Sequence, residues 1–351
     1  MKIKTLKFSI YLLSIISLFI ACNNDDDELF TFVEADRTEQ QVLDKSSLLT
    51  YLSTHYYNSS FFATGSDHKY TDIVIEELPQ DEDGNYLDLP DPDQNTLLID
   101  DIETYTVEYL ETEYEYYILK LNQGEGDSPE FTDFVRVRYE GSSIETGLIF
   151  DSTVIPFDQQ LQGNLINSFG AIKGWQLAMP QFNASSGFST DNGVVDFNNF
   201  GLGIMFLPSG LAYFSGTNTG SLYDNLIFKI ELLQVAEIDH DNDGIPSYIE
   251  DLNSNFVVED DDTDGNATPD FIDNDDDGDR VLTRNELISK QYIVNTNIGE
   301  EEPVFSENEY EISRSDDFGV ITINTVTPAD VNNDGIPDYL DETIAIDYNE
   351  D

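Results

Sequence analysis

The sequence has 351 residues, of which 71 are Asp or Glu and 15 are Lys or Arg, so its formal net charge at pH 7 is −56. Such an acidic chain repels phosphate backbones, which argues against nucleic acid as a partner. Hydrophobic residues make up 39% of the chain and include 22 Phe and 19 Tyr, which excludes a wholly disordered protein. The single cysteine excludes an intramolecular disulfide and a multi-cysteine zinc site. At roughly 100–200 residues per domain, the length predicts two or three folded units.

Residues 1–21 are typical of a lipoprotein signal peptide. Three lysines precede an apolar run at 8–20 that is short for a membrane span. The run ends Leu18-Phe19-Ile20-Ala21-Cys22, which resembles a bacterial lipobox, where a small residue precedes the cysteine that is diacylated. We therefore predict lipidation of Cys22 and attachment to the membrane through that lipid. The alternative is an ordinary secretory signal that ends in a cysteine by chance.

An acidic spacer follows Cys22. Its sequence, Asn23–Glu28, resembles the export signal that sends lipoproteins of the Bacteroidetes group to the cell surface. The expected location is therefore the outer membrane of the cell, as a lipoprotein that faces either the periplasm or the cell surface.

Residues 22–103 are expected to form a spacer and a small helical region, and their sequence indicates no function. Apolar residues between 35 and 57 fall near helical spacing, which favours one or two short helices. These residues are Val42, Leu43, Leu48, Leu49 and Leu52. Residues 58–100 are rich in the Asp, Asn, Gly and Pro residues that favour turns.

A strand pattern begins near residue 104. Segments rich in aromatic and β-branched residues lie at 105–110, 114–121, 134–139 and 226–233. In one of them, alternation places Val135, Val137 and Tyr139 on one face. After Val235 the composition becomes strongly acidic, so we expect one domain over 104–236 and a second region over 237–351.

Six motifs follow one another within the first of these domains. They are Val135–Gly141, Gly147–Ser152, Pro156-Phe157, Ala171–Trp175, Leu211–Tyr213 and Leu226–Leu233. This ordered set resembles an FKBP-type peptidyl-prolyl cis-trans isomerase domain. The resemblance implies an α+β fold, in which an antiparallel sheet wraps around a short helix. That helix would begin near Lys173 and end near Pro180, because proline breaks helices.

The same resemblance implies an apolar pocket that holds a proline ring. The matching positions with catalytic roles are Tyr139, Phe150, Asp151, Phe157, Ile172, Trp175, Tyr213 and Phe228. Trp175 would form the floor of the pocket, and Asp151 would lie at its edge. The backbone N–H of Ile172 and the hydroxyl of Tyr213 would meet carbonyl groups of the substrate.

Prolyl isomerisation needs no nucleophile, metal or cofactor. Rotation about a peptide bond faces a barrier of about 18–20 kcal/mol that is set by amide resonance. Resonance places negative charge on the carbonyl oxygen, and water stabilises that charge. An apolar pocket that excludes water therefore makes the bond easier to twist, and it binds the twisted form best. The expected partners are proline-containing polypeptides, and the expected function is isomerisation and assisted folding of exported proteins.

Three departures from the family pattern concern activity. Phe214 stands where the family has Gly, the loop 219–225 lacks the usual proline, and the segment 181–207 is longer than usual. One alternative is therefore a catalytically weak FKBP-like module that binds partner segments. Another is a structural surface lipoprotein stabilised by calcium.

The region 237–351 predicts a set of calcium loops. Residues 239–250 fit the pattern D-x-[DN]-x-[DN]-G-x5-E, and 260–273, 275–286 and 330–341 repeat it less regularly. Ca²⁺ takes about six to eight oxygen ligands, which alternate acids on a tight turn can direct to one point. The expected ligands are Asp239, Asp241, Asp243, Glu250, Asp260, Asp262, Asp264, Asp275, Asp277, Asp279, Glu286, Asp330, Asn332, Asp334 and Asp341.

The residues that follow these loops bear on the kind of repeat. A Gly-Ile-Pro-Ser/Asp-Tyr continuation resembles thrombospondin type 3-like repeats more than paired-helix EF-hands. That resemblance implies calcium as a structural ion that holds a segment without an apolar core. The alternative interpretation is an acidic run that is merely solvated.

Overall fold

The computed structural model describes residues 32–65, 68–165 and 168–349. The signal peptide and Cys22 lie outside the described residues. No helix within the described ranges combines the length and apolar character that a membrane span requires. The chain divides into two units, Met1–Ala35 and Asp36–Asp351, and the helices and strands below all belong to the second.

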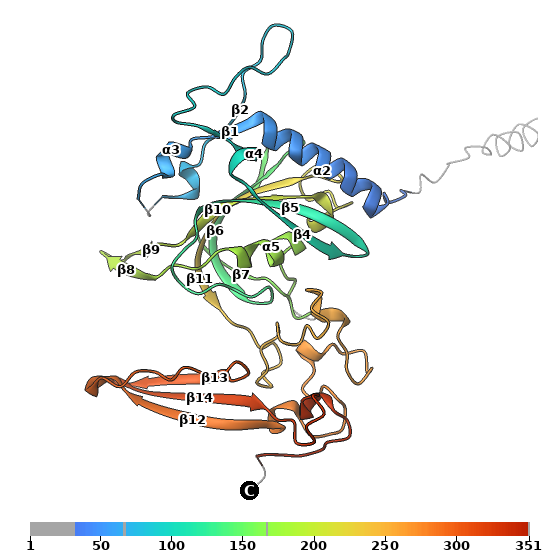
Figure 1. Ribbon diagram of the computed structural model, residues 1–351, viewed down its shortest axis with the longest axis vertical. Coiled ribbons are helices and arrows are strands. Elements are labelled where there is room, and N and C mark those ends of the chain that lie inside the picture. Colours follow the sequence, from blue (N-terminus) through green and yellow to red (C-terminus); the bar gives the residue numbers. More distant parts are fainter. Residues whose placement is uncertain (1–31, 66–67, 166–167, 350–351) are drawn as a thin grey trace, which may run out of the picture. The chain divides into compact units, whose positions relative to one another are not determined.

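A six-stranded antiparallel sheet forms the centre of the fold (Figure 1). In order across the sheet, its strands are β4 (Glu103–Tyr109), β5 (Thr112–Asn122), β10 (Gly201–Leu207), β11 (Leu226–Ala236), β6 (Phe134–Ser143) and β7 (Ile149–Gln160). Every neighbouring pair is antiparallel. The four segments with a strand pattern all lie in this sheet.

Both faces of the sheet are buried, because alternate side chains of its central strands enter two different cores. In β11, Phe228 and Ile230 belong to the first core, whereas Ile227 and Leu233 belong to the second. Successive side chains of any strand point to opposite faces of the sheet. A strand in a sheet that is covered on both sides therefore needs apolar residues at nearly every position. The run Leu226–Leu233 meets that need.

The short helix α5 (Lys173–Ala178) covers the first face. It continues as the 3-10 turn η2 (Met179–Gln181), which contains Pro180. Trp175 and Leu177 of the helix are buried in the first core against the strands. The expected α+β arrangement of an antiparallel sheet around a short helix is therefore confirmed.

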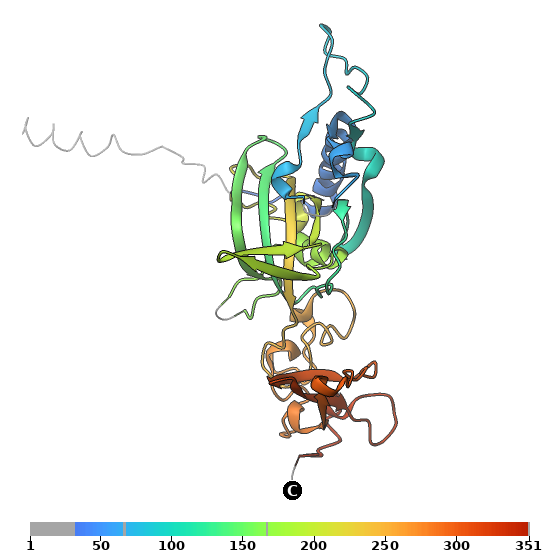
Figure 2. The same cartoon turned by 90° about the vertical axis from the view of Figure 1, so that its left-hand side faces the viewer.

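A long helix, α2 (Arg37–Thr54), packs on the second face (Figure 1 and, turned by 90°, Figure 2). Asp36 caps its start, where its side chain accepts a hydrogen bond from the backbone N–H of Glu39 at 3.0 Å. Leu48 and Leu52 are fully buried in the second core, whereas Val42 is exposed. The expectation of one or two short helices is thus corrected to a single 18-residue helix, and only part of the apolar set faces the sheet.

A buried polar contact fixes this helix. Asp44 accepts hydrogen bonds from the backbone N–H of Ser209 at 2.9 Å and from its hydroxyl at 2.6 Å. Ser209 begins the 3-10 turn η3 (Ser209–Leu211), which follows β10. The segment 37–54 is therefore a structural layer of the sheet region.

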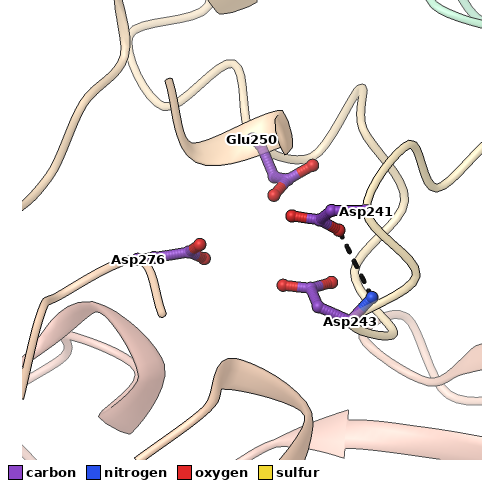
Figure 3. Close-up of side chains that lie close together, drawn as sticks. All are labelled: Asp241, Asp243, Glu250 and Asp276. Carbon is purple, nitrogen blue, oxygen red and sulfur yellow. Dashed lines mark hydrogen bonds between the residues drawn. The ribbon is translucent and has the colours of Figure 1, made fainter. Parts of the chain in front are cut away.

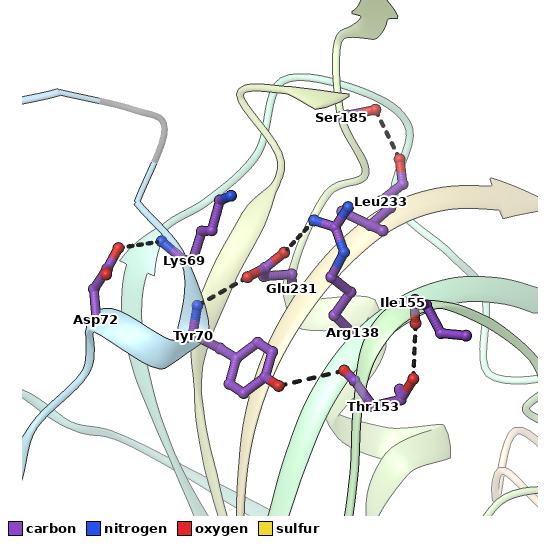
Figure 4. Close-up of polar contacts among 9 residues, drawn as sticks. All are labelled: Lys69, Tyr70, Asp72, Arg138, Thr153, Ile155, Ser185, Glu231 and Leu233. Atoms are coloured by element: carbon purple, nitrogen blue, oxygen red, sulfur yellow. Dashed lines mark hydrogen bonds and ion pairs between the residues drawn. The ribbon is translucent and has the colours of Figure 1, made fainter. Parts of the chain in front are cut away.

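The remainder of the N-terminal region forms a three-stranded sheet in the order β2-β1-β3. Its elements are β1 (His55–Tyr57), α3 (Ser59–Phe62), η1 (Tyr70–Asp72), β2 (Ile75–Glu77), β3 (Thr96–Leu97) and α4 (Leu98–Asp101). Figure 4 shows how η1 joins the central sheet. The buried carboxylate of Glu231 accepts hydrogen bonds from the backbone N–H of Tyr70 at 2.9 Å and from Arg138 at 2.8 Å. Loss of Arg138 would leave this buried carboxylate without a compensating charge, which is strongly destabilising.

The acidic region contains little regular structure before a small sheet. Between 237 and 286 the structure has only the 3-10 turns η4 (Val258–Asp260), η5 (Asp270–Ile272) and η6 (Thr283–Asn285). The sheet has the order β12-β14-β13, and η7 and η8 lie nearby in the chain. Their bounds are β12 (Leu287–Asn295), η7 (Thr296–Ile298), β13 (Tyr310–Asp317), β14 (Val320–Pro328) and η8 (Asp338–Leu340).

Candidate functional site

A cavity of about 190 Å³ opens between the start of α5 and strands β6, β7 and β11. Its lining residues are Tyr139, Phe150, Asp151, Gln159, Gly170, Ala171, Ile172, Trp175, Tyr213 and Phe228. Seven of the eight residues that the sequence places in a pocket therefore surround one cavity. Gln159, Gly170 and Ala171 are additional, although Ala171 belongs to one of the ordered motifs.

Aromatic rings meet edge to face in the wall and floor of this cavity. The ring of Trp175 lies 5.1 Å from that of Tyr139 and 5.3 Å from that of Phe228, with interplanar angles of 89° and 88°. Phe150 meets Phe228 at 5.7 Å and 89°. Edge-to-face pairs at these distances are favourable and fix the ring orientations, so the floor is rigid.

A glycine in β6 allows two of these rings to meet. A Cβ atom at Gly141 would lie 2.7 Å from a ring carbon of Phe228 and 2.8 Å from a ring carbon of Phe150. Both distances are shorter than real contacts, so any other residue at position 141 would displace the wall. The close approach of the two rings therefore explains why the first ordered motif ends in glycine.

The polar edge of the cavity is an Asp–Tyr pair. The hydroxyl of Tyr139 donates a hydrogen bond of 2.6 Å to the carboxylate of Asp151. Burial and this carboxylate raise the pKa of Tyr139 well above its usual value. Burial, and after it Asp151, also raises the pKa of Tyr213. Both hydroxyl groups therefore remain protonated donors at neutral pH.

Three donors on lining residues have no hydrogen-bond acceptor among the described residues. They are the backbone N–H of Ile172, the hydroxyl of Tyr213 and the indole N–H of Trp175. Ile172 caps α5, and its amide is free because the first N–H groups of a helix have no acceptor within it. The indole N–H of Trp175 is buried. This donor set suits a ligand that carries carbonyl groups.

Phe157 lies outside the residues that line the cavity, unlike the other seven expected positions. The pairing of β6 with β7 shifts register between Val137 and Tyr139, which leaves Phe157 opposite Val137 and Thr153 opposite Tyr139. An irregularity of this kind re-aims the side chains of the bulged strand. The ring of Phe157 is 43% exposed and lies 6.3 Å from that of Tyr139.

Two of the departures from the expected pattern, Phe214 and the long segment 181–207, do not fill the cavity. Phe214 is buried elsewhere, where the guanidinium carbon of Arg37 in α2 lies 4.1 Å from its ring centre. The long segment 181–207 forms the hairpin of β8 (Gly187–Asp191) and β9 (Val194–Asn198) and contributes none of the lining residues. The cavity is open despite these departures.

Side-chain contacts join the start of α5 to the acidic region. Lys173 donates a hydrogen bond to the carbonyl of Phe256, and burial lowers the pKa of Lys173 to about 8. Gln162 donates to Glu259 at 2.8 Å, and a ring nitrogen of His240 lies 3.2 Å from the carbonyl oxygen of Gln162. Lys173 adjoins Ile172, so the acidic region contacts a residue next to the pocket.

The acidic loops bring two groups of carboxylates together. Asp241, Asp243, Glu250 and Asp276 offer oxygen atoms that all lie within 4.8 Å of one another (Figure 3). Asp275, Asp277 and Asp279 form a second such group. Asp276 was not among the expected ligands. The sequence carries a signal for it, since alternation along 275–277 directs the middle residue away from its neighbours.

Burial and mutual repulsion dominate the electrostatics of the first group. Burial, followed by the charge of Asp243, raises the pKa of Asp241 to about 9 and that of Asp276 to about 10. The pKa of Asp243 rises to about 7, and that of Glu250 also rises well above its usual value, in both cases chiefly through burial. The carboxylates therefore lack compensation by positive charge.

The other expected ligands stay outside these groups in the described residues. They are Asp239, Asp260, Asp262, Asp264, Glu286, Asp330, Asn332, Asp334 and Asp341. Several hold their own loops together instead. The carboxylate of Asp239 accepts hydrogen bonds from the backbone N–H groups of Asn242 at 2.7 Å and Gly244 at 2.9 Å. Asp330 accepts from Gly335 at 3.0 Å in the same way.

Comparison with known proteins gives one family match in sequence. A family described as BamM C-terminal matches residues 240–312, which contain all but the first residue of the acidic loop 239–250, the next two acidic loops and β12. The match over these residues is thus to this family, whereas the sequence suggested thrombospondin type 3-like repeats. No curated protein matches the chain in sequence.

Solved structures similar to this chain include three proteins related to prolyl isomerases. A peptidyl-prolyl cis-trans isomerase from Pseudomonas syringae pv. tomato str. DC3000 is 15% identical with a TM-score of 0.31, and the match covers 59% of this chain and 100% of that one. FkpA from Escherichia coli is 17% identical with a TM-score of 0.29, covering 56% and 61%. The N-terminal domain of FKBP42 from Arabidopsis thaliana is 11% identical with a TM-score of 0.29, covering 38% and 93%. At these low scores, function has to be argued from the pocket residues themselves.

Proposed function

We propose that the region around the central sheet is a peptidyl-prolyl cis-trans isomerase of the FKBP type that helps exported proteins to fold. The observation that supports this function best is the cavity itself. It combines an aromatic floor and wall with three hydrogen-bond donors that have no acceptor among the described residues. That combination suits a proline ring flanked by peptide carbonyls.

The proposed reaction breaks no covalent bond. The ring of a substrate proline rests on the indole of Trp175, and the aromatic wall excludes water from the carbonyl oxygen of the preceding residue. Without water, the charge-separated resonance form is less stable, so the peptide bond twists more easily. The N–H of Ile172 and the hydroxyl of Tyr213 hold neighbouring carbonyls while the bond rotates, which favours the twisted form over either planar form.

The test is isomerisation of a proline-containing peptide by the chain from residue 23 onward. We expect turnover by the wild type and a loss of at least tenfold in kcat/KM for Trp175→Ala, which removes the floor. Tyr213→Phe removes one hydroxyl that donates a hydrogen bond. Because one hydrogen bond contributes about 0.5–1.5 kcal/mol, we expect kcat/KM to fall by roughly 2- to 12-fold. A wild type that does not exceed the uncatalysed rate would contradict the proposal.

Phe188→Ala is the matched control for these variants. Phe188 is an exposed aromatic residue of the β8–β9 hairpin and lies outside the cavity. We expect its kcat/KM to stay within twofold of the wild type. Circular dichroism of each variant separates lost turnover from lost folding, which matters most for Trp175→Ala because Trp175 belongs to the core.

A second candidate is a chaperone that binds chains without turnover. Strand β7 lies at the edge of the sheet and carries Val154 and Ile155, each 71% exposed. Exposed apolar residues on an edge strand suit an extended, unfolded segment. The test measures how well the protein suppresses the aggregation of an unfolded chain. This candidate is favoured if the double variant Val154→Ser, Ile155→Ser loses the suppression and Trp175→Ala keeps it.

We also propose that the protein is held in the outer membrane by a lipid on Cys22, which lies outside the described residues. The lipobox-like sequence that ends at Ala21-Cys22 supports this location. In a bacterial host, the wild type should partition with membranes and carry a labelled fatty acid, and Cys22→Ala should do neither. Incorporation of label into Cys22→Ala would contradict lipidation at this position.

A further inference from the structure

Buried carboxylate oxygens without partners occur at several places in the acidic region, and the first carboxylate group contains six of them. Glu250 and Asp276 are each 1% exposed, and neither oxygen of either side chain accepts a hydrogen bond. One oxygen of Asp243, which is 2% exposed, and one oxygen of Asp241 are likewise buried without a partner. Buried charge without compensation is among the costliest features that a fold can contain. Something that neutralises these oxygens therefore belongs at this place.

Protein groups do not provide that neutralisation. Among the described residues, no Lys, Arg or His forms an ion pair with any of the four carboxylates. Within the described part of the chain, the backbone supplies only two hydrogen bonds to these four carboxylates. They run from the N–H of Ile245 to Asp243 at 2.8 Å and from the N–H of Asp243 to Asp241 at 3.3 Å. A bound cation would supply the compensating charge that the protein itself does not provide.

We propose that Asp241, Asp243, Glu250 and Asp276 form one calcium centre whose ligands come from two separate loops. The spacing of the oxygens allows one ion to contact all four, and the buried all-carboxylate chemistry favours Ca²⁺ over Mg²⁺. Oxygens on opposite sides of Ca²⁺ are about 4.6–5.2 Å apart, because each lies about 2.3–2.6 Å from the ion. The four oxygens here lie within 4.8 Å of one another. Mg²⁺ needs about 4.0–4.2 Å across and an octahedral shell that retains water, which suits a buried all-carboxylate site poorly.

The position of Asp276 distinguishes this centre from a single-loop site. Asp241, Asp243 and Glu250 lie in the first acidic loop, whereas Asp276 lies between two members of the second carboxylate group, Asp275 and Asp277. In Figure 3 the Asp276 side chain approaches the other three from a different part of the chain. A cation at the centre therefore cross-links the two loops.

The cross-linked loops also contact the region around the central sheet. The ring of His240, next to Asp241, packs at 5.3 Å against the ring of Phe271 and reaches the carbonyl of Gln162. Phe271 shares a small core with Phe131, which precedes β6. Cation binding at the centre therefore orders the loops that rest on the region around the central sheet.

Calcium titration after chelation tests the centre directly. The chain from residue 23 is treated with EDTA, desalted and titrated with CaCl₂ or MgCl₂ by calorimetry, and its thermal unfolding is followed. We expect calcium to bind and to raise the unfolding temperature of the wild type. Asp276→Asn should lose one binding event or weaken it at least tenfold. In EDTA the same variant should unfold at or above the wild-type temperature, because one buried charge is gone.

The opposite signs of these two effects separate ligation from a merely structural role. A residue needed only for packing would lower the unfolding temperature with and without calcium. Glu250→Gln should repeat the pattern of Asp276→Asn, whereas Asp275→Asn should weaken a different binding event. Asp317→Asn is the matched control, since it removes the same charge from an exposed position on β13 and should leave binding unchanged.

Three results would overturn the proposal. The first is wild-type protein that binds no calcium at 1 mM. The second is Asp276→Asn that keeps the number of sites and their affinities. The third is magnesium that binds this centre as tightly as calcium does.

Discussion

The central-sheet region and the acidic loops reach their structures by different physical means. The sheet carries an apolar core on each face, one around Trp175 of α5 and the other around Leu48 of α2. The segment 237–286 has small apolar clusters and no α-helix or strand. Its most buried groups include carboxylates. Burial of apolar area positions the first region, whereas the second depends on what its oxygens bind.

This difference determines which conditions should affect each region. The hydrophobic effect is insensitive to trace metal, while two unit charges about 4 Å apart repel by about 4 kcal/mol at an effective dielectric constant of about 20. A chelator should therefore act on one region alone. A change in the apolar core should act on the other.

Removal of calcium is expected to have the largest effect. In EDTA, amide hydrogen exchange over 239–286 should accelerate at least tenfold, because the carboxylates of the first group separate when no cation holds them. Exchange in β5, β10 and β11 should change less than twofold. Mass spectrometry of exchanged peptides measures both regions in one sample. Equal acceleration in the two regions would break the comparison.

Leu48→Ala is expected to have the next largest effect, on the opposite region. Leu48 is fully buried in the second core, and Leu-to-Ala changes in cores cost about 2–5 kcal/mol. The free energy of unfolding of the sheet region should fall by that amount and lower its denaturation midpoint, while calcium affinity stays unchanged. Val42→Ala, at an exposed position of the same helix, is the control and should shift the midpoint little. An unaffected sheet region in Leu48→Ala would mean that α2 is not part of its cooperative unit.

Local sequence pattern predicts the strands and the short helix of the sheet region well. It does not predict features that depend on residues distant in the chain or on how strands pair. The strand segments, the short helix at Lys173 and seven pocket residues follow from alternation and from the ordered motifs. The burial of Asp44 in α2 could not be predicted, because its partner Ser209 is distant in the chain. The position of Phe157 depends on a register shift, which the sequence does not reveal. The strand Val320–Pro328 was not among the predicted segments, although its alternating side chains carried a strand signal.

The acidic region shows the opposite balance. Its loop spacing indicates cation ligands, yet spacing within one loop cannot show that two loops share a centre. Asp276 joins the first group only because the chain folds back between Glu250 and Asp275. Asp239 fits the loop pattern, but its carboxylate holds backbone N–H groups of its own loop. Pattern therefore identifies the type of ligand, and the fold decides which carboxylates meet.

The smallest expected effect concerns the junction of the two regions, where Asp133 is buried beside β6. Its carboxylate accepts hydrogen bonds from the backbone N–H of Glu130 at 2.8 Å and from that of Ile238 at 3.4 Å. Burial is the main reason that the pKa of Asp133 rises to about 7, and the nearby charges of Glu237 and Glu130 add to it. The folded protein thus holds this proton to about pH 7, whereas the unfolded chain releases it near pH 3.9.

Because the folded state binds more protons between those two values, Asp133 lowers the free energy of unfolding as pH rises from about 4 to 7, and the loss persists above pH 7. Asp133→Asn removes the charge but retains only one of the two oxygen acceptors. At pH 8 in saturating calcium we expect a net gain of about 1–3 kcal/mol, since an electrostatic relief of at most about 4 kcal/mol exceeds the one hydrogen bond, worth about 1 kcal/mol, that is lost. At pH 4.5 the free energy of unfolding of the variant should equal that of the wild type or fall slightly below it.

Denaturant unfolding at both pH values measures the difference between the two proteins. Saturating calcium keeps the carboxylate groups of the loops in the same state in both. A variant that is less stable at pH 8 than at pH 4.5, relative to the wild type, would show that the carboxylate of Asp133 is ionised and well compensated where the sheet region meets the acidic one.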